Sequence, residues 1–198
     1  REMRVVGNDV VKGYVMLSTS FDGPLSTTAR FSTLRLVCMN GLTLGENLAP
    51  VVRVPHSTTF DADDAKVTLG VGDAFERFEE EAGLMATKGI SDRQAIEFFL
   101  AVYHDMKPED LNDPAKASLA DRTIARMAEY FKRAPGAELH SARGTVWGAL
   151  HAVTYDVDHG DFDRGSRRSA ENIARAAMFG AGERRKNRAR DLALQLAA

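Results

Sequence analysis

Hydrophobic and polar residues alternate along the first part of the chain. Most residues of Val10–Leu17 are β-branched, aromatic or apolar, and from Ala29 onward apolar and polar residues alternate. A period of two is typical of a strand that buries one face. Between these runs lies Phe-Asp-Gly-Pro at residues 21–24, which predicts a reversal of the chain. We therefore expect a long β-hairpin near the N-terminus.

Further strand predictions follow the hairpin. The apolar run Leu34–Met39 predicts that the second strand continues until both of its faces are buried. Asn40-Gly41 then predicts a turn. Val51–Val54 and Lys66–Val71 are two shorter strand candidates.

From Asp73 the apolar residues recur in steps of three and four, which is typical of amphipathic helices. Ser91 and Gln94 have the spacing of a capping box, which marks the start of one helix. Asp113 followed by Pro114 is typical of an N-cap and first helical position. Later helices are expected within residues 144–160, 169–179 and 183–196.

The predicted strands all precede the predicted helices. This order favours an α+β fold over an alternating α/β fold. We expect a β-rich hairpin or sheet at residues 1–72 and a helical region at residues 73–198, packed together as one domain. Because the chain begins at Arg1 without a methionine, we also expect an N-terminal portion to be missing.

Composition places the chain among ordinary globular proteins. It has 198 residues, of which 44% are hydrophobic and 27% charged, enough for one substantial core. No apolar run approaches the roughly 20 residues that span a membrane, so we expect no membrane association. The single cysteine, Cys38, lies in an apolar run. A lone buried cysteine fits a reducing compartment, and we expect a cytoplasmic protein.

The formal net charge of −2 conceals an asymmetry. Basic residues concentrate between Arg164 and Arg190, whereas acidic residues concentrate at 61–64, 73–81 and 109–113. Such a basic end can bind a polyanion. It can equally pair with the acidic segments of the same fold or of a neighbouring subunit.

Segment 144–160 holds the only tryptophan and two of the five histidines, so it is the first place to look for a reactive site. On a helix, His151 and His159 are separated by roughly 10 Å along the axis and cannot share one metal ion. Asp156 and His159 could do so, but a site needs three or four ligands. HExxH, GxSxG and GxxxxGK motifs are absent from the sequence. We therefore predict no catalytic residue, no metal site and no cofactor.

Arginines are the remaining candidates. Single-stranded nucleic acid is held by cations that contact phosphates and by aromatic side chains that stack on bases. Arg30 adjoins Phe31, and a cluster of arginines follows Phe162. The predicted nucleic-acid-binding residues are Arg30, Arg35, Arg53, Arg164, Arg167 and Arg168.

Four blocks of sequence resemble a known family. They are Arg30–Gly45 (RFSTLRLVCMNGLTLG), residues 54–57 (VPHS), Gly144–Gly160 (GTVWGALHAVTYDVDHG) and residues 177–182 (AMFGAG). In order and spacing they are similar to the phage/plasmid-like protein family, catalogued as the domain of unknown function number nine hundred and thirty-two. This sequence departs from the family pattern TxWGAxNAVTEYxDH by having His151 in place of asparagine and Tyr155-Asp156 in place of Glu-Tyr.

The resemblance implies a protein of phages or plasmids, without an established reaction. By analogy of fold order, the chain is also similar to single-strand annealing proteins, which join a β-hairpin or small sheet to helices, oligomerise and hold DNA in a basic groove. We expect a non-enzymatic, homo-oligomeric protein that binds single-stranded DNA in recombination or replication. Two alternatives stay open: a metal-dependent nuclease using Asp156, Asp158, His159 and His56, and a protein-interaction module that modulates a host system.

Overall fold

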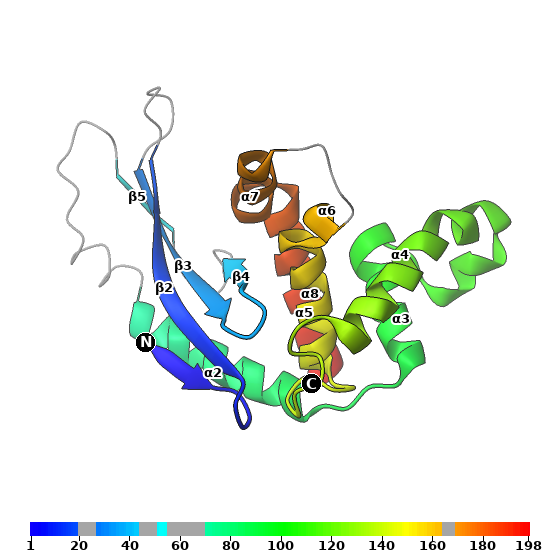
Figure 1. Ribbon diagram of the computed structural model, residues 1–198, viewed down its shortest axis with the longest axis horizontal. Coiled ribbons are helices and arrows are strands. Elements are labelled where there is room, and N and C mark those ends of the chain that lie inside the picture. The colour runs from blue at the N-terminus through cyan, green and yellow to red at the C-terminus, as the bar shows by residue number, and fades with distance from the viewer. Residues whose placement is uncertain (20–26, 44–50, 55–69, 164–168) are drawn as a thin grey trace.

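The computed structural model describes residues 1–19, 27–43, 51–54, 70–163 and 169–198 (Figure 1). An antiparallel sheet comes first and helices follow, which confirms the predicted α+β order. The strands are β1 (Glu2–Arg4), β2 (Val10–Ser18), β3 (Thr27–Arg35), β4 (Asn40–Thr43) and β5 (Val52–Val54). The helices are α2 (Val71–Thr87), α3 (Asp92–His104), the short 3-10 helix η1 (Pro108–Asn112), α4 (Pro114–Arg133), α5 (Val146–Asp158), α6 (Gly160–Asp163), α7 (Ala170–Phe179) and α8 (Ala181–Ala197).

The predicted hairpin is confirmed, and β2 and β3 are its two strands. They pair in one register along their length, with Val15 opposite Phe31 and Tyr14 opposite Ser32. The sheet order is β1-β2-β3-β4, and β5 pairs with the first residues of β3. The predicted reversal at residues 21–24 lies outside the described residues.

The apolar run after β3 does not form the buried strand that its composition predicts. β3 ends at Arg35, the chain turns through the next residues, and Asn40-Gly41 opens β4 instead of forming the turn. Met39 takes a left-handed conformation with φ 55° and leaves its side chain 58% exposed. The prediction failed because the buried ion pair of Arg35 fixes the strand end, and hydrophobicity alone carries no information about that pair.

Helix boundaries follow the predicted caps. Ser91 and Gln94 form the predicted capping box, and the Asp113 carboxylate accepts from the Ala115 N–H at 2.9 Å. Two boundaries differ: Val71, assigned to a strand from the sequence, is the first residue of α2, and the last helix, expected within residues 183–196, spans Ala181–Ala197. The rest of that predicted strand falls outside the described residues, apart from Gly70 in a turn.

The core lies where α5 meets the sheet and α2. Trp147, Leu150 and Val153 of α5 have no exposed surface, as expected from their helical spacing. One face of the hairpin packs on α2, where the rings of Phe31 and Phe75 meet edge to face with centroids 6.2 Å apart. Gly13 permits this approach, because a Cβ there would lie 2.5 Å from the Phe75 ring.

The basic helix α8 pairs with acidic residues of its own chain. Arg190 binds Glu81 of α2 at 2.6 Å, and Arg188 binds Asp105. Of the two interpretations left open by the charge asymmetry, pairing within the fold therefore accounts for these arginines. Among the described residues, no helix is long and apolar enough to cross a membrane.

A buried ion pair connects the sheet to α5. The Arg35 guanidinium donates to both oxygens of Asp9, at 2.7 and 2.8 Å, and both residues are almost fully buried. The Asp9 carboxylate also accepts from the Ser141 hydroxyl at 2.6 Å and from the Trp147 indole at 2.9 Å. Burial by itself would raise the pKa of Asp9, but the hydrogen bonds and charge of Arg35, with the Ser141 and Trp147 donors, hold it below its ordinary value.

We expect the Asp9→Asn substitution to lower the free energy of unfolding by about 3–5 kcal/mol, because it leaves the Arg35 charge buried without a counterion. Urea denaturation measures this loss. The control is Glu76→Gln, which removes the exposed Arg1–Glu76 ion pair and should cost less than about 1 kcal/mol. Equal losses in the two variants would contradict a structural role for the buried pair.

Candidate functional site

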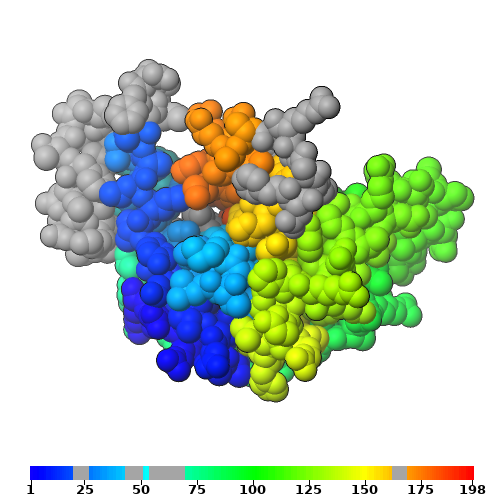
Figure 2. All heavy atoms as spheres, in the orientation of Figure 1, coloured from blue at the N-terminus to red at the C-terminus, as the bar shows by residue number. Residues whose placement is uncertain are grey.

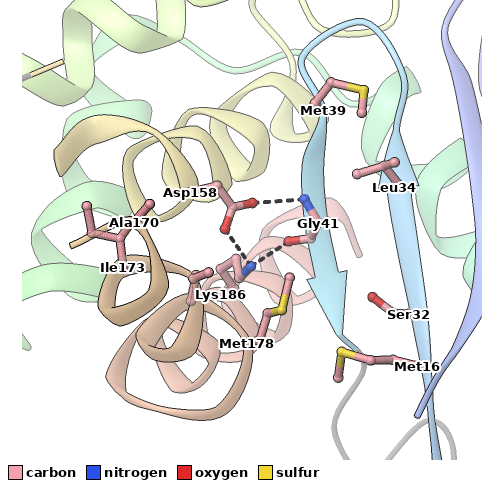
Figure 3. Close-up of a pocket in the computed structure, with 12 residues that line it drawn as sticks. Met16, Ser32, Leu34, Met39, Gly41, Asp158, Ala170, Ile173, Met178 and Lys186 are labelled. Carbon is pink, nitrogen blue, oxygen red and sulfur yellow. Dashed lines mark hydrogen bonds and ion pairs between the residues drawn. The ribbon is translucent and has the colours of Figure 1, made fainter. Parts of the chain in front are cut away.

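A cavity of about 350 Å³ lies between the sheet and the helices α7 and α8 (Figure 3). Met16, Ser32 and Leu34 line it from the hairpin, and Ile173, Ala177 and Met178 line it from α7. Apart from a few polar groups, its wall is therefore made of hydrocarbon and thioether groups. A concave, largely apolar site with a few polar groups is the usual form of a ligand-binding site.

The alternation of side chains along the hairpin strands explains which residues face this cavity. Successive side chains of a strand project to opposite faces. Phe31 projects toward α2, so its neighbour Ser32 and the cross-strand residue Tyr14 project to the cavity side. Residues that face the core and residues that line the cavity therefore alternate along the hairpin, with the period of two seen in the sequence.

One wall of the cavity carries a connected set of polar contacts. The Lys186 ammonium of α8 donates to the Gly41 carbonyl at 2.6 Å and to Asp158 Oδ1 at 2.9 Å (Figure 3). Asp158 Oδ2 accepts from the Gly41 N–H at 2.8 Å. Because the Lys186 side chain is only 3% exposed, this pair fixes α5 and α8 against the backbone of β4 and contributes no net charge.

The rim of the cavity is open and apolar. Met39 and Met178 line it and are largely exposed, and Phe179 is exposed at the end of α7. In Figure 2 the surface is hollowed between β2, in blue, and α7, in orange. Tyr14 is 47% exposed on the same face of the hairpin as Met16. An exposed aromatic ring therefore lies on the face of the hairpin that lines the cavity.

Two of the predicted arginines lie on this face of the sheet. Arg30 is opposite Met16, and its guanidinium donates to Glu183 of α8 at 2.6 Å. Arg53 of β5 is exposed and lies opposite Thr28 of β3. Thr28 is two residues before Arg30, so the two project to the same face of the sheet. Because residues directly opposite each other project to the same face, Arg53 belongs to the cavity side of the sheet.

Arg35 does not belong with them. It is 2% exposed, and its donors are directed to Asp9 and to the Gly136 carbonyl. We therefore remove it from the predicted phosphate contacts and assign it to the core. The strand period carried a signal for this difference, because Arg35 has the same parity as Ala29 and Phe31 of the apolar face, whereas Arg30 has the opposite parity. The sequence does not show the carboxylate partner that allows the Arg35 charge to be buried there. Arg164, Arg167 and Arg168 lie outside the described residues.

The carboxylates considered for metal chemistry have protein partners. Asp156 accepts from the Tyr103 hydroxyl at 2.7 Å and from Arg126 at 2.8 Å. Burial and the neighbouring Asp156 raise the pKa of Tyr103 well above its ordinary value. Asp158 is bound by Lys186, and His56 lies outside the described residues. Within the parts of the chain that the structure describes, no three His, Cys, Asp or Glu residues are placed to hold a metal ion.

Lys186 is the functional candidate that the sequence did not single out. It is one of five cations between residues 184 and 190, and its own neighbours do not distinguish it. Arg190 is also buried and binds Glu81 of α2, so it is the contact with β4 that separates Lys186 from the other four. Cys38, in contrast, is buried as its apolar run predicted, and burial raises the pKa of its thiol.

His151 is buried behind this wall, on the core side of α5. Its ring packs on Trp147 with centroids 4.2 Å apart, and its Nδ1 lies 3.2 Å from the Thr154 hydroxyl. The Asn40 amide donates to the carbonyl of His151 and to Thr154, which ties β4 to α5. Burial, helped by the positive charge of Arg35, lowers the pKa of His151 well below its ordinary value of 6.5.

We expect His151 to make the protein sensitive to mild acid. Because its pKa is lower in the folded state, the unfolded state binds the proton first, and stability falls as the pH drops below 6.5. The loss approaches about 1.4 kcal/mol per pH unit. The His151→Asn variant should lose less stability than the wild type between neutral pH and pH of about 5.

Urea denaturation at the two pH values measures this difference. The matched control is His140→Asn, which makes the same replacement at an exposed position outside the core. An unchanged pH dependence in His151→Asn would contradict the assignment.

Comparison with known proteins gives one match. The family model described as Domain of unknown function (DUF932) matches residues 1–189, which is nearly the whole chain. Neither the curated proteins nor the solved structures give a significant match.

Proposed function

The chain belongs to the DUF932 family, and we propose from the geometry of its own residues that it binds single-stranded DNA. The binding surface is the cleft between the cavity face of the sheet and α7. The biological setting is recombination or replication of a phage or plasmid, in which the protein holds strands for annealing. In this proposal the protein is a binding protein and not an enzyme.

One observation carries the proposal: cations, an exposed aromatic ring and an apolar cavity lie together on one face. Arg30 and Arg53 are the cations, and Tyr14 is the ring. Proteins that bind single strands combine phosphate-contacting cations with surfaces on which bases stack. Arg30 keeps capacity for a phosphate beside Glu183, because a guanidinium has five N–H donors and this contact uses one of them.

The nuclease alternative has less support from the same contacts. A metal-dependent nuclease needs carboxylates that are available to a cation. Asp156 already accepts from Arg126, and Asp158 from Lys186. A metal ion would have to displace a buried or half-buried protein cation at each position. We therefore propose a structural role for both carboxylates.

We also propose that the protein is a homo-oligomer. Among the described residues, β2 pairs with β1 only through Val10–Lys12, so the backbone from Tyr14 to Ser18 has a strand neighbour on the β3 side alone. Tyr14 and Leu17 are large and exposed along this edge. An open edge with exposed apolar side chains is a surface to which a second copy can add a strand.

We expect binding of a labelled single-stranded oligonucleotide to weaken with salt, with the logarithm of the binding constant falling linearly with the logarithm of salt concentration. Replacing Arg53 by glutamine should lower the affinity and reduce the slope by about one, because one phosphate contact is lost. The control is Arg122→Gln, which removes an exposed arginine from α4, away from the cavity. Absence of binding by the wild type at low salt would contradict the proposed function.

We expect the mass of the protein in solution to be a multiple of the 21.7 kDa of one chain. Light scattering after size-exclusion chromatography measures it. Leu17→Lys should shift the distribution toward the monomer, because a charge on the β2 edge opposes strand addition. The matched control is Leu119→Lys on α4, where the leucine is similarly exposed. A wild type that is monomeric at every concentration would contradict the proposal that the protein is a homo-oligomer.

A further inference from the structure

We propose that the cavity between the sheet and α7 takes one unstacked nucleobase of a bound single strand. The inference rests on the proposed function and adds to it the part of the ligand that the cavity recognises. The strand would pass along the mouth of the cavity beside Tyr14, with its phosphates toward Arg30 and Arg53.

The size and walls of the cavity suit a flat aromatic ring. At about 350 Å³ it is at the small end of the range of ligand pockets, roughly 300–1,000 Å³. Its two broad walls are the cavity face of the hairpin, with Met16, and the side of α7 that carries Ile173 and Ala177 (Figure 3). A base inserted between them would bury both faces of its ring against apolar side chains.

Methionine is the predominant large residue of this wall. Of the seven methionines in the chain, Met16, Met39 and Met178 line the cavity. Thioether sulfur makes favourable contacts with aromatic rings, and the unbranched side chain adapts to rings of different shape. These properties suit a cavity that accepts both purines and pyrimidines, as binding without strong sequence preference requires.

The polar wall offers groups for the edge of a base. The Lys186 ammonium has three N–H donors, of which the described contacts to Gly41 and Asp158 use two. Each Asp158 oxygen accepts one described hydrogen bond and can accept another. A donor and an acceptor therefore lie side by side at the wall. The Watson–Crick edge of every base presents adjacent donor and acceptor groups that such a pair can bind.

The distribution of charge favours a base inside the cavity and its phosphate outside. Lys186 and Asp158 neutralise each other, so the cavity has no net charge with which to attract a phosphate. On the same face of the sheet, Arg53 is exposed outside the cavity, and Arg30 is half-buried beside Glu183 of α8. A phosphate in the apolar cavity would lose its hydration without a counterion, which costs far more free energy than burial of a neutral base.

The test compares an oligothymidylate with an oligonucleotide of the same length in which the sugars are abasic. The wild type should bind the abasic strand about tenfold or more weakly, since a stacked base contributes about 1–3 kcal/mol. Ala174→Trp fills the cavity from α7 and should remove most of this difference by weakening binding of the oligothymidylate alone. Ala125→Trp, on the exposed side of α4, is the matched control and should behave as the wild type.

The outcomes separate the two proposals. If the wild type binds both strands equally, or Ala174→Trp binds oligothymidylate as tightly as the wild type does, the base pocket is overturned while DNA binding stands. Failure of the wild type to bind either strand at low salt overturns the proposed function, and the base pocket with it. If Ala174→Trp does not fold, equal binding of the two strands by the wild type still overturns the base pocket, because that comparison uses no variant.

Discussion

The buried pair of Asp9 and Arg35 is the interaction on which the arrangement of this protein depends. Two charges removed from water are tolerated only when every donor and acceptor is satisfied. Here the Asp9 carboxylate is satisfied from β3 by Arg35 and from α5 by the Trp147 indole. Ser141, just before α5, supplies a further donor. The requirement for complete satisfaction therefore fixes where the sheet ends and how α5 lies against it.

A second set of polar contacts fixes α5 and α8 against the sheet. Lys186 and Asp158 clamp α8 and α5 to the backbone of Gly41 in β4. With β4 fixed to α5 and α8, the rest of the hairpin face is left uncovered opposite α7, and the cavity occupies that space (Figure 1, Figure 3). The two buried ion pairs thus have different roles. The Asp9–Arg35 pair joins the sheet to the core, and the Lys186–Asp158 pair holds β4 against the helices beside a cavity of ligand size.

The basic residues of the chain have two different roles. Most cations of α8 are engaged with acidic residues elsewhere in the chain, such as Glu81 and Asp105. Basic composition at the C-terminus therefore describes internal pairing more than a binding surface. Arg30 and Arg53, the cations of the proposed phosphate contacts, share the cavity face of the sheet with Tyr14. That combination of charge, ring and cavity supports the proposed binding of single-stranded DNA.

The sequence by itself determined the β2–β3 hairpin, the order of strands before helices and helix caps such as Ser91, because periodicity and caps are local properties. It also identified Trp147 as a core residue and Arg30 as a candidate contact. Tertiary structure alone decided that Arg35 is buried and that Lys186 faces the cavity. Each of these two outcomes depends on a partner far away in the chain, Asp9 in one case and Gly41 in the other. Hydrophobic pattern specifies which face of an element is buried, but the pairing of distant charges is set only when the elements pack.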